Sequence, residues 1–163
     1  MLKMKNGFSL IELLLVLVLI GTLVAMTVNF TVRNKDRWSL RDTAREITST
    51  YYQAKQRASR ENLSVCLNVG VKEYGLYEEG DVGVWDQIVI KEAFPEKIIA
   101  SSTANFLINP SGFIIDPGTL KISGSQTITL TAPRGVKGGV EIFDTMTITI
   151  YPYGGLRVEK VFK

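Results

Sequence analysis

The chain has 163 residues, a length that fits one domain with an appendage, and it carries 19 Lys and Arg against 16 Asp and Glu. This near-balance of charge argues against a general nucleic-acid-binding protein, because such domains are usually strongly basic. The absence of histidine excludes Ser-His-Asp and Cys-His nucleophile arrangements and imidazole metal sites. The single Cys66 excludes a disulfide within the chain, so we expect a packed core to stabilise the fold.

In chain order, the first predicted element is a membrane-spanning helix. Residues 8–28 are apolar or small apart from Glu12, and about 20 such residues span the hydrocarbon layer of a bilayer. A secretory signal peptide fits less well, because no small-x-small cleavage site follows the run. A plain anchor leaves Glu12 unexplained, since an ionised carboxylate inside a bilayer costs roughly 2.5 kcal/mol or more.

Glu12 needs a cationic partner. No other charged residue lies between Lys5 and Arg33. An internal partner would therefore be a new amino group, created by cleavage just before Phe8. That amine and the carboxylate would lie about one helical turn apart, or they would pair between neighbouring subunits.

The segment Gly7-Phe8-Ser9-Leu10-Ile11-Glu12, preceded by Lys3 and Lys5, resembles the class III signal peptide of type IV pilins and type II secretion pseudopilins. The resemblance implies that a prepilin peptidase cuts between Gly7 and Phe8 and methylates the new Phe8 amine. It also implies that Glu12 neutralises the amine of an adjacent subunit during assembly. The expected location is the bacterial inner membrane, as a single-pass protein with its C-terminal domain outside the cytoplasm, and then a periplasmic or surface filament.

The basic residues that follow the span disagree with this orientation. Counted by the positive-inside rule, they would place the C-terminal part in the cytoplasm. We follow the cleavage motif, which is the more specific signal. These residues continue along the next predicted helix and are Arg33, Lys35, Arg37, Arg41, Arg45, Lys55, Arg57 and Arg60. They suit lipid headgroups or acidic neighbouring subunits, although a solvated helix face is the favoured interpretation.

The second predicted element is an amphipathic stalk helix at residues 33–61. Its apolar residues recur every three or four positions and form one stripe: Leu40, Ala44, Ile47, Tyr51, Ala54 and Ala58. Neither Pro nor Gly interrupts residues 22–69, so we expect one helix from about Phe8 to Arg60 that stops at Glu61-Asn62.

Residues 62–163 are predicted to form a globular β domain. Apolar and polar residues alternate in residues 127–131, 140–142 and 147–150, and Pro152-Tyr153-Gly154-Gly155 indicates a hairpin. We expect seven to nine short strands in one or two antiparallel sheets that cover the helix. The predicted fold is α+β, with a leader at residues 1–7, a filament-packing helix at 8–32, the stalk helix, and an antiparallel β-sandwich.

Three features of the β domain were considered as sites. A glycine-containing acidic loop offers oxygen ligands for Ca²⁺ but matches no EF-hand spacing, so a solvated loop is favoured; its residues are Glu73, Glu78, Glu79, Asp81 and Asp86. Arg134–Gly139 lacks the ending of a phosphate loop and is interpreted as a hairpin connection. Cys66 is expected to be a half-buried strand cysteine, on the face opposite to Leu63, Val65, Leu67 and Val69.

The predicted function is structural: a minor pseudopilin of a type II secretion pseudopilus. The alternative is a minor type IV pilin for pilus assembly, adhesion or DNA uptake. Predicted partners are other pilins or pseudopilins through the N-terminal helix, the prepilin peptidase and an inner-membrane assembly platform. DNA is a disfavoured partner, for which five basic residues could gather at one end: Arg134, Lys137, Arg157, Lys160 and Lys163. We predict no enzymatic activity, catalytic residue, metal or cofactor.

Overall fold

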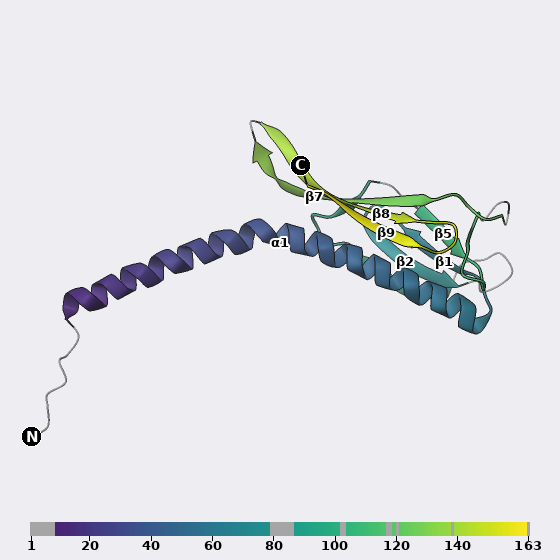
Figure 1. Cartoon of the computed structure of the whole chain (residues 1–163), viewed down its shortest axis with the longest axis horizontal. Helices are drawn as coiled ribbons and strands as arrows, with labels where there is room; N and C mark the ends of the chain where they lie inside the picture. Colours follow the sequence, from purple (N-terminus) through teal and green to yellow (C-terminus); the bar gives the residue numbers. More distant parts are fainter. Residues whose placement is uncertain are drawn as a thin grey trace, which may run out of the picture. The chain divides into compact units, whose positions relative to one another are not determined.

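The computed structural model describes residues 9–78, 87–101, 104–116, 119, 121–137 and 139–162. The chain divides into two compact units, Met1–Lys35 and Asp36–Lys163. A single helix, α1 (Leu10–Glu61), contributes to both of them (Figure 1). Each unit is described by itself.

The part of α1 that belongs to the second unit carries the predicted apolar stripe. All six residues of that stripe, from Leu40 to Ala58, are buried, so the predicted helical spacing is confirmed. The helix ends at Glu61, as predicted, and Asn62 follows with a φ of 54°. The amide of Leu63 donates a hydrogen bond to the carbonyl of Ala58 at 3.2 Å, which satisfies one of the free carbonyls of the last turn.

Nine strands follow in the described residues, at the upper end of the predicted number, and they form two antiparallel sheets. The first sheet has the order β3-β2-β1-β5-β6 and contains β1 (Val65–Val69), β2 (Glu73–Glu78), β3 (Gln87–Ala93), β5 (Ala104–Ile108) and β6 (Ile114–Ile115). The second has the order β4-β7-β8-β9 and contains β4 (Ile99–Ala100), β7 (Gln126–Lys137), β8 (Val140–Ile150) and β9 (Leu156–Phe162). The predicted α+β class is confirmed.

Two strands are longer than predicted. Residues 140–142 and 147–150 belong to one continuous strand, β8. Arg134–Lys137 continues β7, so the interpretation of Arg134–Gly139 as a hairpin connection is wrong for these four residues, whereas Gly139 lies in the turn before β8. The pairing with β8 shifts between Pro133 and Gly135, and this bulge lets the ladder continue past a proline and a glycine.

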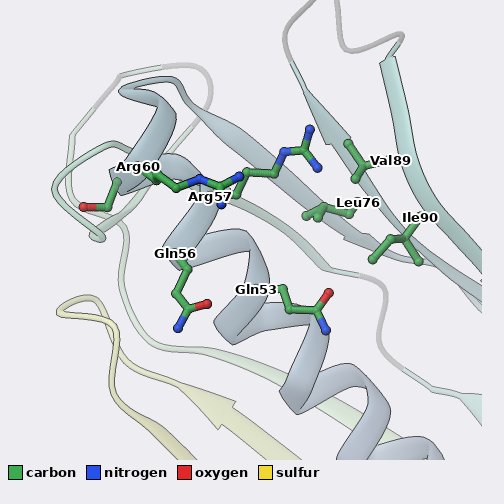
Figure 2. A pocket seen from close by; sticks show the side chains of 8 residues that line it. Gln53, Gln56, Arg57, Arg60, Leu76, Val89 and Ile90 are labelled. Atoms are coloured by element: carbon green, nitrogen blue, oxygen red, sulfur yellow. The ribbon is translucent and has the colours of Figure 1, made fainter.

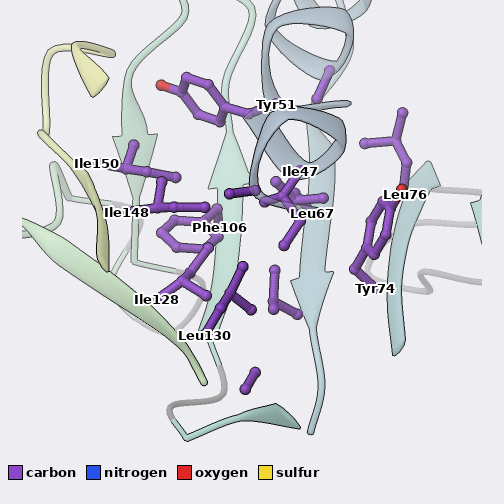
Figure 3. Packing of buried hydrophobic residues seen from close by; sticks show 14 of the residues in the cluster. Ile47, Tyr51, Leu67, Tyr74, Leu76, Phe106, Ile128, Leu130, Ile148 and Ile150 are labelled. Atoms are coloured by element: carbon purple, nitrogen blue, oxygen red, sulfur yellow. The ribbon is translucent and has the colours of Figure 1, made fainter. Parts of the chain in front are cut away.

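One apolar core joins α1 to both sheets (Figure 3). Ile47 and Tyr51 come from the helix, Leu67 and Phe106 from the first sheet, and Ile148 from the second; all five are fully buried. Burying a large apolar side chain is worth about 1.5 to 3 kcal/mol, so this cluster is the main stabilising feature of the unit. On β1, Val65, Leu67 and Val69 are buried while Cys66 is half-buried, as the alternation predicted.

A second contact between the layers is made by two turns and a lysine, here called the glycine junction (Lys55, Gly112 and Gly154). The predicted hairpin after β8 is closed by hydrogen bonds between Tyr151 and Gly155 at 2.8 Å and between Gly154 and Tyr151 at 2.9 Å. Gly112 and Gly154 have φ values of 79° and 78°, and a Cβ built on either would lie within 2.6 Å of the Lys55 side chain. The lysine of α1 therefore lies against one turn from each sheet.

Candidate functional site

Glu12 lies in the first turn of α1. The carbonyl of Ser9 accepts the backbone amides of Glu12 at 3.0 Å and of Leu13 at 3.1 Å, which starts the helix. No ion pair within the described residues involves the Glu12 carboxylate. Gly7 and Phe8, the predicted cleavage site, lie outside the described residues.

The helix around Glu12 is apolar on all sides. Leu10–Val28 has a mean hydropathy of 2.6, and none of its residues is buried. By length and composition this segment could cross a membrane. Leu10 is 82% exposed and Leu17 60% exposed. Within the first unit these side chains therefore need lipid or other helices around them.

The few polar groups of this segment are compatible with an apolar environment. The Thr22 hydroxyl donates to the carbonyl of Leu19 at 2.8 Å, and the Thr27 hydroxyl donates to that of Leu23 at 2.9 Å. A Cβ at Gly21 would meet no atom within 4 Å, so the glycine leaves room for the backbone of a neighbouring helix. The carboxylate of Glu12 is the exception: in an apolar bundle it would favour a neighbour that supplies a positive charge.

Two basic residues of the stalk pair with carboxylates of the β domain, so the solvated-face interpretation is wrong for them. Arg37 Nε lies 2.7 Å from Asp144 Oδ2, and the Asp144 side chain is only 2% exposed. Arg57 pairs with the buried Glu78 and also with Glu61 at 3.4 Å. These contacts fasten α1 to one strand of each sheet.

Asp144 was not found by sequence reasoning, although a signal existed. It lies on β8 with the same parity as Met146, Ile148 and Ile150, and all four are buried. A carboxylate at an inward position of a strand requires a charged partner. The sequence shows that a partner is needed but does not show that it is Arg37.

The acidic cluster is not a loop where the structure describes it. Glu73 and Glu78 lie at the two ends of β2, and each pairs with a cation, Glu73 with Lys91 at 3.2 Å and Glu78 with Arg57. The other three members lie outside the described residues. Among the described residues, no group of three His, Cys, Asp or Glu could hold a metal ion.

The described members of the predicted basic group do not all lie at one end, because Arg157 is separated from the others. Arg157 pairs opposite Thr149, whereas Arg134 lies where β7 faces Phe143 and Ile142. At about 3.4 Å per residue these positions lie roughly 20 Å apart along β8. Arg157 is also paired with Glu159 at 2.8 Å, and Arg134 lies 4.0 Å from Asp144. Lys163 lies outside the described residues.

A groove of about 580 Å³ lies between the end of α1 and the strands β2 and β3 (Figure 2). Its helical side carries Gln53, Gln56, Arg57 and Arg60, and its strand side carries Leu76, Val89 and Ile90. Arg60 hydrogen-bonds to Glu61 at 2.9 Å, and this bond, with Arg57 nearby, lowers the pKa of the Glu61 carboxyl. Arg57 therefore links the helix to β2 through Glu78, whereas Arg60 pairs with a carboxylate of its own helix.

Cys66 lies in an environment that disfavours its thiolate. Burial raises the pKa of its thiol to about 11. The thiolate is the reactive form, so very little of it is present near neutral pH. The interpretation of Cys66 as a structural strand residue is consistent with this environment.

Comparisons with known proteins agree with the motif and the fold. A family model described as a prokaryotic N-terminal methylation motif matches residues 2–28. One crystal structure of the type IV minor pilin FimU of Pseudomonas aeruginosa has a TM-score of 0.53 at 16% identity, covering 80% of this chain and 92% of that chain. Another crystal form of FimU has a TM-score of 0.50 at 12% identity, covering 73% and 91%.

No curated protein matches the chain by sequence. At identities of 16% and 12% the two structures show a shared fold. The methylation motif over residues 2–28 and the fold shared with FimU together support a type IV pilin-like protein.

Proposed function

We propose that the chain is a minor structural subunit of a filament built from pilin-like proteins. The observation that carries the proposal is the combination of an apolar helix surface, exposed on all sides from Leu10 to Val28, with the single carboxylate of Glu12. A compact second unit is joined to this helix. The helix would hold the subunit in the bacterial inner membrane, with the second unit outside the cytoplasm, and would later pack against helices of other subunits.

Processing precedes assembly in this proposal. A prepilin peptidase cuts between Gly7 and Phe8 and methylates the Phe8 amine. An inner-membrane assembly platform then adds the subunit to the filament. Glu12 pairs with the N-terminal amine of a neighbouring subunit, because an unpaired carboxylate among apolar helices is unfavourable by several kcal/mol.

Substitution of Glu12 tests this role directly. Glu12→Val should leave membrane insertion and cleavage intact and should strongly reduce incorporation into filaments, measured by immunoblotting sheared or purified filaments. Leu14→Ile is the matched control, because it changes an exposed apolar residue on the same helix without changing charge. Normal incorporation of the Glu12→Val protein would refute the role of Glu12. Peptide mass spectrometry should find an N-methylated phenylalanine at position 8, and an intact Met1 terminus in membranes would refute the processing step.

Such a subunit could belong to either of two kinds of filament. The first is a type II secretion pseudopilus, in which the chain supports protein secretion. The second is a type IV pilus, which the fold shared with the minor pilin FimU supports. Uptake of DNA receives less support, because Arg134 of β7 and Arg157 of β9 lie far apart and each has a carboxylate within 4.0 Å.

The extracellular proteome of a deletion strain separates the two kinds of filament. Loss of a set of secreted proteins, with the same proteins retained in the periplasm, assigns the chain to secretion. An unchanged extracellular proteome together with reduced surface pili assigns it to a pilus.

A further inference from the structure

The second unit carries another feature, which does not depend on the filament that the chain joins. A groove of about 390 Å³ lies between α1 and the edge of the second sheet. Its apolar lining comes from Ala44 and Tyr52 of α1, Met146 of β8 and Val158 of β9. Tyr52 is 48% exposed and Val158 40% exposed, so two large apolar side chains of this groove face solvent.

One wall of the groove is an edge strand. Among the described residues β9 pairs with β8 alone and stands last in the order β4-β7-β8-β9 (Figure 1). Val158 and Lys160 pair opposite Ile148 and Met146, and both line the groove. Arg157 and Glu159 alternate with them on the outer face of the strand. Such an edge presents backbone amides and carbonyls that another extended chain can pair with.

The rim of the groove is positively charged. Arg41 and Arg45 approach from α1 and Lys160 approaches from β9. Asp42 lies 3.6 Å from Arg45, and both side chains are largely exposed, so this pair is open to exchange with another carboxylate. Three cations around an apolar floor, beside a strand edge, complement a segment that is extended, partly apolar and acidic.

We propose that this groove, called the α1–β9 groove, binds an extended acidic peptide segment of another protein chain as an added strand on β9. The backbone of the segment pairs with the free edge of β9. Alternate side chains of the segment point into the groove, where apolar ones contact Tyr52 and Val158 and carboxylates contact Arg45 and Lys160.

The test uses the full-length chain in detergent micelles and fluorescent seven-residue peptides, matched in length to the seven residues of β9. A peptide with valine and glutamate in turn at every second position and threonine between them, here called the valine–glutamate peptide, should bind, as measured by fluorescence anisotropy at low salt. In a strand its valines and glutamates share one face, so both can point into the groove. Binding should weaken at physiological salt, where the Debye length is about 8 Å. The corresponding valine–lysine peptide should not bind. An otherwise identical valine–glutamate peptide with N-methylated backbone amides should lose at least about tenfold in affinity, because it cannot extend the sheet.

Charge-reversal variants test whether the peptide binds in the α1–β9 groove. Lys160→Glu and Arg45→Glu should each weaken binding of the valine–glutamate peptide about tenfold or more. Arg157→Glu is the matched control: it makes the same change on the same strand but on the outer face, and it should change affinity less than about twofold. Thermal melts of each variant check that the fold is retained.

Four results would overturn the proposal. The first is that the valine–glutamate peptide does not bind at concentrations up to about 1 mM. The second and third are that the valine–lysine peptide, or the N-methylated peptide, binds as tightly as the valine–glutamate peptide. The fourth is that Arg157→Glu weakens binding as much as Lys160→Glu does. Vesicles of phosphatidylcholine with phosphatidylglycerol serve as a competing probe. Binding of vesicles that Lys160→Glu abolishes, without binding of the peptide, would assign the groove to lipid instead.

Discussion

At the glycine junction, the loss of folding stability caused by Gly154→Ala has two sources: a strained backbone and contact of the added methyl group with neighbouring atoms. A Cβ at Gly154 would lie 2.4 Å from Lys55 Nζ and 2.8 Å from the carbonyl oxygen of Gly112, with a φ of 78°. The left-handed backbone costs a non-glycine residue about 1 to 2 kcal/mol. The lysine end can swing away, but the carbonyl belongs to a turn and has to shift, which adds about 1 to 2 kcal/mol. Gly154→Ala should therefore destabilise the second unit by about 2 to 4 kcal/mol.

Two other glycines supply the controls. Gly139 has a φ of 80° and nothing within 4 Å of a Cβ, so Gly139→Ala should show the backbone cost alone, about 1 to 2 kcal/mol. Gly124 also has open space and no positive φ, so Gly124→Ala should be neutral or slightly stabilising. Urea unfolding of the full chain in micelles, followed by tryptophan fluorescence, measures the free energy of unfolding for each variant.

The decisive measurement repeats Gly154→Ala in a Lys55→Ala background. If the carbonyl of Gly112 limits the space, the excess cost over Gly139→Ala should persist in that background. An equal cost for Gly154→Ala and Gly139→Ala would show that the neighbouring atoms do not matter. Loss of the excess in the Lys55→Ala background would show that the lysine, and not the backbone of the other turn, is the limiting contact.

Three further predictions concern buried polar groups. Tyr51 is fully buried and its hydroxyl has no hydrogen-bond partner among the described residues, so Tyr51→Phe should be neutral or stabilising by up to about 1 kcal/mol in urea unfolding; a destabilisation of more than about 1 kcal/mol would refute the reasoning. Arg37→Ala should cost about 2 to 4 kcal/mol because it leaves the carboxylate of Asp144 buried, whereas Arg45→Ala removes a pair with exposed side chains and should cost under about 0.5 kcal/mol; similar losses for the two would contradict this. The raised pKa of Cys66, about 11, predicts alkylation at pH 8 that is roughly 100-fold slower in the folded chain than in urea, and it predicts stability that falls as pH rises above the unfolded pKa of the thiol; equal alkylation rates would refute both.

Local patterns predicted the elements of this fold well where one periodicity dominates. The stripe from Leu40 to Ala58 repeats at helical spacing for several turns, and every member is buried. The alternation around Cys66 gave the correct inward face of β1. The shift at Pro133 and Gly135 was not predicted, because proline and glycine usually end a strand and only the pairing with β8 carries β7 through them.

Contacts between residues far apart in the chain leave no periodic pattern in the sequence. Arg37 and Asp144 are separated by 107 positions. Gly112 and Gly154 belong to turns of different sheets that the fold brings into contact with each other and with Lys55. Sequence reasoning identified Glu12 because a charge inside an apolar run is anomalous on its own. The pairing of Arg37 with Asp144 depends instead on which strand lies against this part of the helix, and the packing of the whole unit determines that.

The same helix meets two different environments, and this explains why one chain can combine a stable domain with a surface that is left open. From Leu10 to Val28 the apolar residues surround α1. Covering one face of this segment would leave the other faces exposed, so the segment requires lipid or other helices on all sides. From Leu40 to Ala58 the helix carries one apolar stripe, which the two sheets cover, while Tyr52 lies outside the stripe and is 48% exposed. The ion pairs of Asp36 with Lys97 and of Arg37 with Asp144 lie at the start of this covered part. Under the proposed function, stability and assembly therefore depend on separate stretches of one helix, so a substitution at Glu12 should change assembly without weakening the core.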